Sequence, residues 1–373
     1  MAGIYIHIPF CKQACHYCNF HFSTSLRYRT ELMAALVKEI ELQKNYCDGE
    51  IIDTIYFGGG TPSLCTTEEL QSILEAIQNN FNVASNTEIT CEVNPDDITE
   101  TTLISWKTIG INRLSIGIQS FFDDDLQWMN RAHSSQQATE SLNLATNYFD
   151  NISADLIYGT PLLTNEKWEE NVNRMMELNI PHLSCYALTV EPKTPLQKMI
   201  LENKKENVDP EKQATQFLLL MKWLEKAGFE HYEISNFAKP GYRSRHNTSY
   251  WQQKKYLGVG PAAHSFNGKE RQWNISNNTI YIDSINNGQL SFQKEVLTEV
   301  QKLNEYIMTS LRTIEGLNFE KLDTKNKMEL LKRSKKYIET GKLIMQNNHF
   351  VLTANGKLFA DGIAADLFFT EKS

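Results

Sequence analysis

Short apolar runs alternate with helix-like stretches through the first half of the chain. Residues rich in β-branched and aromatic side chains predict strands at 4–8, 54–57, 88–93, 113–118, 153–158 and 182–188. Between them, apolar residues recur every three or four positions and predict helices, for example over about 30–44 and 210–228. A capping box at Thr66 and Glu69 marks the start of another. This alternation predicts an α/β fold with a parallel sheet. Six strand–helix units are two fewer than a complete (β/α)₈ barrel needs, so we expect an open, partial (β/α)₆ barrel.

The pattern changes after about residue 237. Residues 241–290 are rich in Asn, Gly, Ser and Tyr, which predicts loops and short irregular pieces. From residue 297 the chain is helical again, followed by a predicted hairpin at 342–345 and 350–353 and a last helix from residue 355. This order predicts a small α+β module that resembles a winged helix. We therefore expect a barrel at 1–235, an irregular connecting segment at 236–295 and a C-terminal helical domain at 296–373.

Composition narrows the classes of function. The 373 residues include 37 Lys and Arg against 45 Asp and Glu, a net charge of −8, which disfavours a general nucleic-acid binder. The basic cluster at 332–336 is more typical of a solvated helix face. No run approaches the 18 or more apolar residues of a membrane span, and no basic region precedes the first apolar run. The sequence predicts a cytoplasmic protein without an integral membrane segment.

Three of the seven cysteines lie together, directly after the first predicted strand: Cys11, Cys15 and Cys18. Thiolates are soft ligands, and three at this spacing can surround one metal centre. An iron–sulfur cluster with three thiolate ligands leaves one iron open. Structural zinc requires four ligands, which His16 or His21 would complete, so zinc is the alternative. The other cysteines are scattered, and Cys91 and Cys185 are expected to be buried hydrophobic residues.

Other candidate residues also follow predicted strands. Gly58, Gly59 and Gly60 precede Thr61 and Pro62, and three glycines let a ligand approach the backbone and its N–H groups. The motif is neither GxGxxG nor a phosphate-binding P-loop. Glu92, Gln119 and Asp155 lie at the ends of the next strands or within them. Because the carboxyl ends of barrel strands meet at one face, we expect these groups to share a pocket.

Together these motifs resemble the radical S-adenosylmethionine (SAM) proteins, and more narrowly the oxygen-independent coproporphyrinogen III oxidase family. The resemblance covers almost the whole chain. It rests on 6–10 (IHIPF) before the cysteines, GGGTP at 58–62, RLSIGIQSF at 113–121, DLIYGTP at 155–161 and YALTVEP at 186–192.

The resemblance implies a [4Fe–4S] cluster held by Cys11, Cys15 and Cys18, whose open iron is chelated by the amino and carboxylate groups of SAM. It further implies a set of residues that line the SAM site: Tyr5, Tyr17, Gly59, Gly60, Thr61, Glu92, Gln119, Arg131, Asp155 and Ala187. An arginine and two carboxyl groups suit a cofactor that presents a carboxylate, an ammonium group and ribose hydroxyls.

The family has an oxidase branch, which decarboxylates coproporphyrinogen III to protoporphyrinogen IX, and a heme chaperone (HemW-type) branch. The oxidases carry a further cysteine where this chain has Phe20, and an extension before the first strand, which here begins at Ile4. Residues 246–251 match the HNxxYW motif of the chaperones. Imidazole is a common axial ligand of heme iron, so His246 is the predicted heme contact.

The sequence therefore predicts a radical SAM heme chaperone with a [4Fe–4S] cluster, SAM and heme. Coproporphyrinogen III oxidase is the alternative. Whether the chain is an enzyme stays open, and an enzyme of this family would be a coproporphyrinogen III dehydrogenase-type oxidoreductase. No catalytic residue is singled out. The expected partners are heme and heme-accepting proteins, without nucleic acid. A homodimer and peripheral contact with a membrane stay open.

Overall fold

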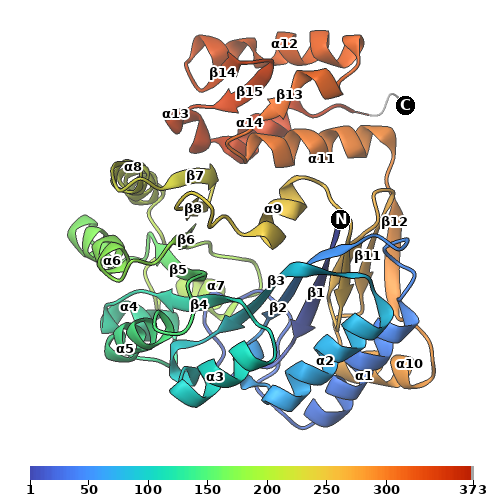
Figure 1. The fold of residues 1–373 in the computed structure, drawn as a ribbon. Helices are drawn as coiled ribbons and strands as arrows, with labels where there is room; N and C mark the ends of the chain where they lie inside the picture. The colour runs from blue at the N-terminus through green and yellow to red at the C-terminus, as the bar shows by residue number, and fades with distance from the viewer. Residues whose placement is uncertain (371–373) are drawn as a thin grey trace.

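The computed structural model describes residues 1–370, and its main feature is one curved sheet of twelve strands (Figure 1). The strand order is β12-β11-β10-β9-β1-β2-β3-β4-β5-β6-β8-β7. Six parallel strands in sequence order form its centre: β1 (Ala2–Ile8), β2 (Ile52–Gly59), β3 (Val83–Val93), β4 (Arg113–Gln119), β5 (Ile152–Tyr158) and β6 (His182–Ala187). Each predicted strand and the predicted partial barrel are confirmed.

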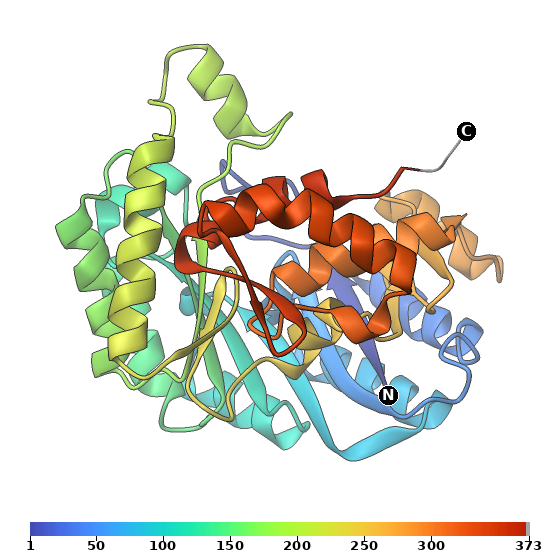
Figure 2. The ribbon, with the colours of Figure 1, turned by 90° about the horizontal axis from the view of Figure 1, so that it is seen from above.

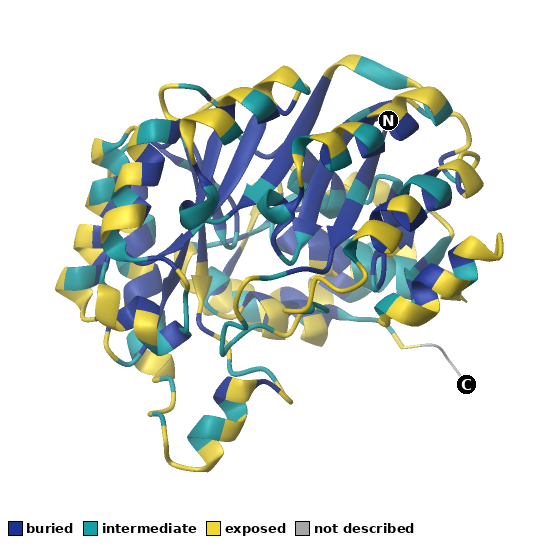
Figure 3. Ribbon diagram, turned by 90° about the horizontal axis from the view of Figure 1, so that it is seen from below, coloured by how far each residue is buried: buried dark blue, intermediate teal, exposed yellow. Residues whose placement is uncertain are grey.

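Helices cover the outside of this sheet. They are α1 (Arg29–Leu42), α2 (Thr67–Asn80), α3 (Glu100–Thr108), α4 (Asp123–Met129), α5 (Ser135–Ala145), α6 (Asn165–Glu177) and α8 (Pro210–Lys226). The short α7 (Pro195–Leu201) instead projects away from the sheet (Figure 2). The capping box at Thr66 and Glu69 forms as predicted. Figure 3 shows the strands buried and the helices exposed on their outward faces. Among the residues described, no helix is long and apolar enough to cross a membrane.

The two faces of β1 show how the core is divided. Ile4, Ile6 and Ile8 are fully buried and belong to the main hydrophobic core beneath the helices. Tyr5 and His7 alternate with them and therefore face the inside of the barrel. The inner face is polar on the neighbouring strands too, where Thr54 and Thr90 are buried. Buried polar side chains need hydrogen-bonding partners, so the inside of this barrel is suited to binding a polar ligand.

The expectation of irregular structure over 241–290 is wrong. The segment forms β9 (Tyr256–Val259), β10 (His264–Phe266), β11 (Glu270–Asn274) and α10 (Asn278–Asn286), and β12 (Phe292–Val296) follows. These strands extend the barrel sheet because β9 pairs in parallel with β1, and β7 (Glu230–Glu233) and β8 (Asn236–Ala238) extend its other edge. The strands have three to five residues, too few for alternation to show, and β12 is exposed throughout.

A short helix, α9 (Arg245–Trp251), packs on β1 and β2 at the amino end of the barrel (Figure 1). Its first two backbone N–H groups donate to the buried carboxylate of Glu88, from Arg245 at 3.2 Å and from His246 at 3.0 Å. A carboxylate at a helix amino terminus satisfies unpaired donors and favours the helix dipole. Glu88 on β3 thus fixes α9 in the barrel.

The C-terminal module has its own core and lies over α9 and the amino ends of the strands (Figures 1 and 2). It contains α11 (Glu299–Leu311), β13 (Leu317–Asn318), α12 (Thr324–Glu339), β14 (Leu343–Gln346), β15 (His349–Leu352), α13 (Ala354–Lys357) and α14 (Ala360–Leu367). The predicted hairpin is confirmed as β14–β15. Arg312, after α11, ties the module to the barrel through buried Glu233, at 3.0 Å.

Buried Glu39 joins α1 to the added strands. Its carboxylate accepts hydrogen bonds from the Tyr281 hydroxyl at 2.5 Å, the Asn274 amide at 2.7 Å and the Gly260 N–H at 2.8 Å. Burial raises the pKa of this carboxyl above its usual range. Three elements distant in sequence thus depend on one side chain.

We expect Glu39→Ala to lower the free energy of unfolding by about 3 kcal/mol, because it leaves three buried donors without an acceptor. Glu39→Gln, which keeps one acceptor oxygen, should cost less. Urea denaturation measures both, with Glu41→Ala on the exposed side of the same helix as the control. Equal stability of Glu39→Ala and Glu41→Ala would contradict this role.

Candidate functional site

The three clustered cysteines line one cavity at the carboxyl ends of the six parallel strands. The cavity is about 530 Å³, and Cys11, Cys15 and Cys18 are half-buried and free. They belong to the cluster loop, residues 9–28 between β1 and α1. Strand ends from β2 to β6 supply the opposite wall. The expected convergence of strand-end groups on one pocket is therefore seen in the fold.

Backbone hydrogen bonds hold the cluster loop against the glycine segment after β2. Gly60 N–H donates to the Ile8 carbonyl at 2.8 Å, and Thr61 N–H donates to the Phe10 carbonyl at 2.6 Å. A Cβ added to Gly60 would lie 2.5 Å from the Phe10 carbonyl oxygen, closer than any real contact. Only glycine allows the two segments to approach this closely.

The glycines therefore serve the protein's own chain, which corrects their expected role. We expected bare N–H groups for a ligand, but Gly59 N–H donates to Glu92 at 3.2 Å and Gly60 N–H to Ile8. Gly59 also has φ +107°, and a Cβ there would lie 2.6 Å from the His7 ring. Both glycines still line the cavity through their remaining surface.

Arg131 brings a buried positive charge to the cavity wall. Its Nη2 donates to the Gly117 carbonyl and to Asn94 Oδ1, both at 2.8 Å, and Nη1 lies 3.5 Å from Cys15 Sγ. Its Nε is buried without a hydrogen-bond partner among the described residues. A fixed guanidinium with a free donor suits a carboxylate ligand.

Glu92 and Asp155 place two carboxyl groups on the floor of the cavity. Glu92 accepts from the Tyr56 hydroxyl at 2.7 Å and from Gly59. Burial, strengthened by the charge of Asp155, raises the pKa of Glu92 to about 7. Burial likewise raises the pKa of Asp155 to about 6. Both groups change charge near neutral pH, which is typical of functional carboxyl groups.

Gln119 ends β4 in a conformation that few residues other than glycine adopt. Its φ is +66°, and its side chain is almost fully buried at the cavity. Backbone strain of this kind costs about 1–3 kcal/mol and is found most often at functional sites. The strand register between β4 and β5 also shifts between Ile116 and Gln119, which redirects this side chain.

The cysteine set fits an iron–sulfur cluster better than a single zinc ion. Within residues 1–370, no three His, Cys, Asp or Glu side chains converge closely enough to hold one metal ion. The histidines that zinc would need each have one ring nitrogen in a hydrogen bond: His16 Nδ1 lies 3.2 Å from the Trp128 carbonyl, and His21 Nε2 lies 2.7 Å from Asn278. A multi-iron cluster accepts thiolates that are farther apart.

Proton release accompanies metal loading at these thiols. Burial raises the pKa of Cys11 to about 11, against a hydrogen bond from Thr61 that lowers it, and burial also raises the pKa of Cys18. Both thiols are therefore protonated at neutral pH in the metal-free chain. Because the ligand is the thiolate, loading displaces protons and is favoured by higher pH.

The structure brings most of the predicted SAM-site residues into this cavity. Those that line it with the three cysteines are Tyr17, Gly59, Gly60, Thr61, Glu92, Gln119, Arg131, Asp155 and Ala187. Tyr5 lies outside it: its ring lines a second cleft, on the inner face of β1, and its hydroxyl lies 3.1 Å from His7 Nδ1. His246 lines neither space.

His246 lies buried in α9, where we expected an irregular segment. Its Nδ1 lies 2.8 Å from Thr54 Oγ1 and its Nε2 lies 2.7 Å from the Tyr250 hydroxyl, so both ring nitrogens have partners. The ring is 1% exposed and stacks on Tyr56. Burial and the nearby Arg113 charge lower its pKa to about 3. A heme contact at His246 stays a prediction, and it would require one of these bonds to break.

Several cavity residues were missed by the sequence analysis. Asn94 directly follows β3 and holds Arg131, while Ser115 and Gly117 precede Gln119 at alternate positions on β4. The rule that selected Glu92 and Gln119, polar or small residues at the carboxyl ends of strands, would have found all three.

Two comparisons relate this chain to the radical SAM proteins. A model of the Radical SAM superfamily matches residues 5–181. Coproporphyrinogen III oxidase (HemN) from Escherichia coli, a solved radical SAM structure, matches with a TM-score of 0.84 and 22% identity, covering 98% of this chain and 90% of that one. At this identity the match shows the shared fold. A radical SAM domain implies a [4Fe–4S] cluster and SAM.

Curated relatives narrow the class further. The heme chaperone HemW of Bacillus subtilis (strain 168) is 35% identical over 323 residues, 85% of each chain. The heme chaperone HemW of Mycobacterium tuberculosis (strain ATCC 25618 / H37Rv) is 30% identical over 98% of this chain and 94% of its own. The chain belongs to the heme chaperone HemW family.

We expect Gly60→Ala to prevent cluster assembly, because the added methyl group would force the cluster loop away from β2. Iron and sulfide content after anaerobic reconstitution, with the visible absorption of the cluster, measures the effect. Gly362→Ala in α14, where a Cβ meets open space, is the matched control and should load normally. Full loading of Gly60→Ala would show that the close approach is dispensable.

Proposed function

We propose that this chain is a radical SAM heme chaperone that binds heme and delivers it to acceptor proteins. The observation that carries the cofactor part is the convergence of three free cysteines, Arg131 and two carboxyl groups on one cavity. The heme part is supported by the relatives of 30–35% identity that are named heme chaperones. Delivery to acceptors, a cytoplasmic location and a homodimer stay predictions.

In this proposal Cys11, Cys15 and Cys18 hold a [4Fe–4S] cluster. When bound, such a cluster with an open iron supplies one-electron chemistry to SAM. Arg131 pairs with the SAM carboxylate, using the Nε that has no partner among the described residues. Glu92 and Asp155 accept hydrogen bonds from the cofactor's ammonium group and hydroxyls, and Gln119 adds an amide at the same wall.

The oxidase alternative shares the cofactors but not the reaction. Its fold matches over 98% of this chain, so the fold does not separate the two functions. Phe20 supports the chaperone, because the oxidases carry a cysteine there, and Phe20 is 67% exposed beside the cavity.

SAM binding should strengthen as the pH rises through the range from about 6 to about 7, where Asp155 and Glu92 lose their protons. The ionised carboxylates attract the cofactor's positive charges and accept hydrogen bonds at both oxygens, whereas the protonated groups carry no charge and are weaker acceptors. Calorimetric titration of the cluster-loaded protein with SAM across this range measures the change. Glu92→Gln should remove the upper part of the pH dependence. An unchanged profile in that variant would contradict the assignment of Glu92.

The function itself is tested on the anaerobically purified, cluster-loaded protein. We expect saturable binding of hemin, seen as a shifted Soret band, and no protoporphyrinogen from coproporphyrinogen III with SAM and a reductant. Cys15→Ala should lose the cluster and is the control for cluster-dependent effects. Decarboxylated product without specific hemin binding would establish the oxidase alternative instead.

A further inference from the structure

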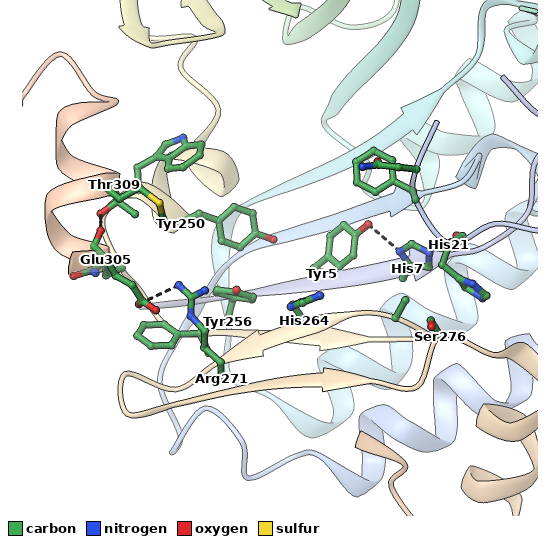
Figure 4. Close-up of a pocket in the computed structure, with 17 residues that line it drawn as sticks. Tyr5, His7, His21, Tyr250, Tyr256, His264, Arg271, Ser276, Glu305 and Thr309 are labelled. Carbon is green, nitrogen blue, oxygen red and sulfur yellow. Dashed lines mark hydrogen bonds and ion pairs between the residues drawn. The ribbon is translucent and has the colours of Figure 1, made fainter. Parts of the chain in front are cut away.

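A second, larger cleft lies along the inner face of β1, β9, β10 and β11 (Figure 4). Its volume is about 680 Å³, within the range of pockets for sizeable organic ligands. It runs from α11, where Glu305 and Thr309 lie, to His7 and His21 at the cluster loop. The proposed SAM residues leave this cleft unused, except that Tyr5 lines it.

The cleft walls combine aromatic faces with a single ion pair. Tyr250 meets Tyr256 edge to face, with ring centroids 4.6 Å apart, and Phe266 lies next to Tyr256. Arg271 pairs with Glu305 at 3.0 Å near α11, and Arg271 Nε is buried without a hydrogen-bond partner among the described residues. Large apolar surfaces with a cation at one end suit a flat, amphipathic ligand that carries carboxylates.

Of the three histidines that line the cleft, only His264 has both ring nitrogens free. His7 is occupied on both sides, by the Tyr5 hydroxyl at 3.1 Å and by the His21 carbonyl at 2.9 Å. His21 Nε2 is bonded to Asn278 at 2.7 Å. Within residues 1–370, no hydrogen bond engages the ring of His264, which begins β10 with its side chain exposed to the cleft.

The surroundings of His264 keep it suited to a metal. Its ring lies nearly parallel to that of Trp273 on β11, with centroids 6.3 Å apart, which limits its orientation. The side chain is exposed and lines the cleft, so its ring nitrogens are accessible to a ligand. Neutral imidazole is the form that binds heme iron.

We propose that this cleft is the heme site, with His264 as the axial ligand of the iron, the porphyrin against Tyr250, Tyr256 and Phe266, and a propionate on Arg271. This inference rests on the proposed heme-chaperone function and moves the iron ligand from His246 to His264. Tyr250 and Trp251 of the HNxxYW motif still line the cleft. The histidine of the motif instead holds α9 on β2 through its hydrogen bond with Thr54.

The site lies next to the proposed cofactors. Asn19 and Phe20 line both this cleft and the cavity of the three cysteines, so a single turn of the cluster loop separates the two spaces. The exposed Phe20 ring, at the position of the oxidases' further cysteine, forms part of that wall.

The test is a hemin titration of the full-length, cluster-loaded protein and of His264→Ala, with absorption and electron paramagnetic resonance spectra of the bound iron. We expect His264→Ala to weaken hemin binding about tenfold or more and to lose the spectrum of an imidazole-ligated iron. Added imidazole should restore that spectrum, which a merely structural residue would not allow. Metal-free protoporphyrin IX should bind both proteins equally, because it makes no axial bond. His349→Ala on β15, away from the cleft, is the matched control.

The outcomes separate the site from the function. A wild-type protein that binds no hemin overturns the proposed function and this inference with it. Hemin bound equally by wild type and His264→Ala, with the same spectrum, overturns only the site. So does loss of the imidazole-ligated spectrum in His246→Ala, provided that this variant keeps its cluster and its unfolding midpoint while His264→Ala binds normally. Arg271→Gln should weaken binding of hemin more than of its dimethyl ester, and equal losses would remove the propionate contact.

Discussion

The close approach of two backbone segments, Gly60 and residues 8–10, is the constraint on which the functional end of this molecule depends. Two N–H···O hydrogen bonds between them fix the position of the cluster loop relative to the sheet, and with it the positions of the three thiols. Arg131 then reaches Cys15 from the opposite wall, and Glu92 is fixed by Gly59. A single methyl group at Gly60 is not compatible with this arrangement.

At the other end of the barrel, a helix of seven residues closes the polar interior. Glu88 accepts from its first N–H groups, and Thr54 holds the imidazole of His246. The residues of the HNxxYW motif therefore lie in two places. His246 contacts Thr54 on β2, while Tyr250 and Trp251 line the cleft.

The sequence was sufficient for the parallel strands, because each has six or more residues, is rich in apolar and β-branched side chains, and has a helix after it. The cavity could also be predicted, because the cysteines and the residues Glu92, Gln119 and Asp155 follow these strands or lie in them and share the same face of the barrel. Sequence reasoning failed where pairing is distant: β9 pairs with β1 across some 250 residues, and three-residue strands such as β10 carry no periodic signal. The burial of His246 was not foreseen, because no local pattern shows that Thr54 and Glu88 enclose it.

The wall formed by Asn19 and Phe20 has a thermodynamic consequence. Ligands bound in the two spaces would both contact this wall, so their binding free energies would be coupled. Such coupling is reciprocal: if the first ligand changes the affinity for the second by some factor, the second changes the affinity for the first by the same factor. Occupancy of the cysteine cavity would then set how tightly a ligand is held in the cleft, and how readily it leaves. A cofactor could control the release of a cargo in this way without being consumed.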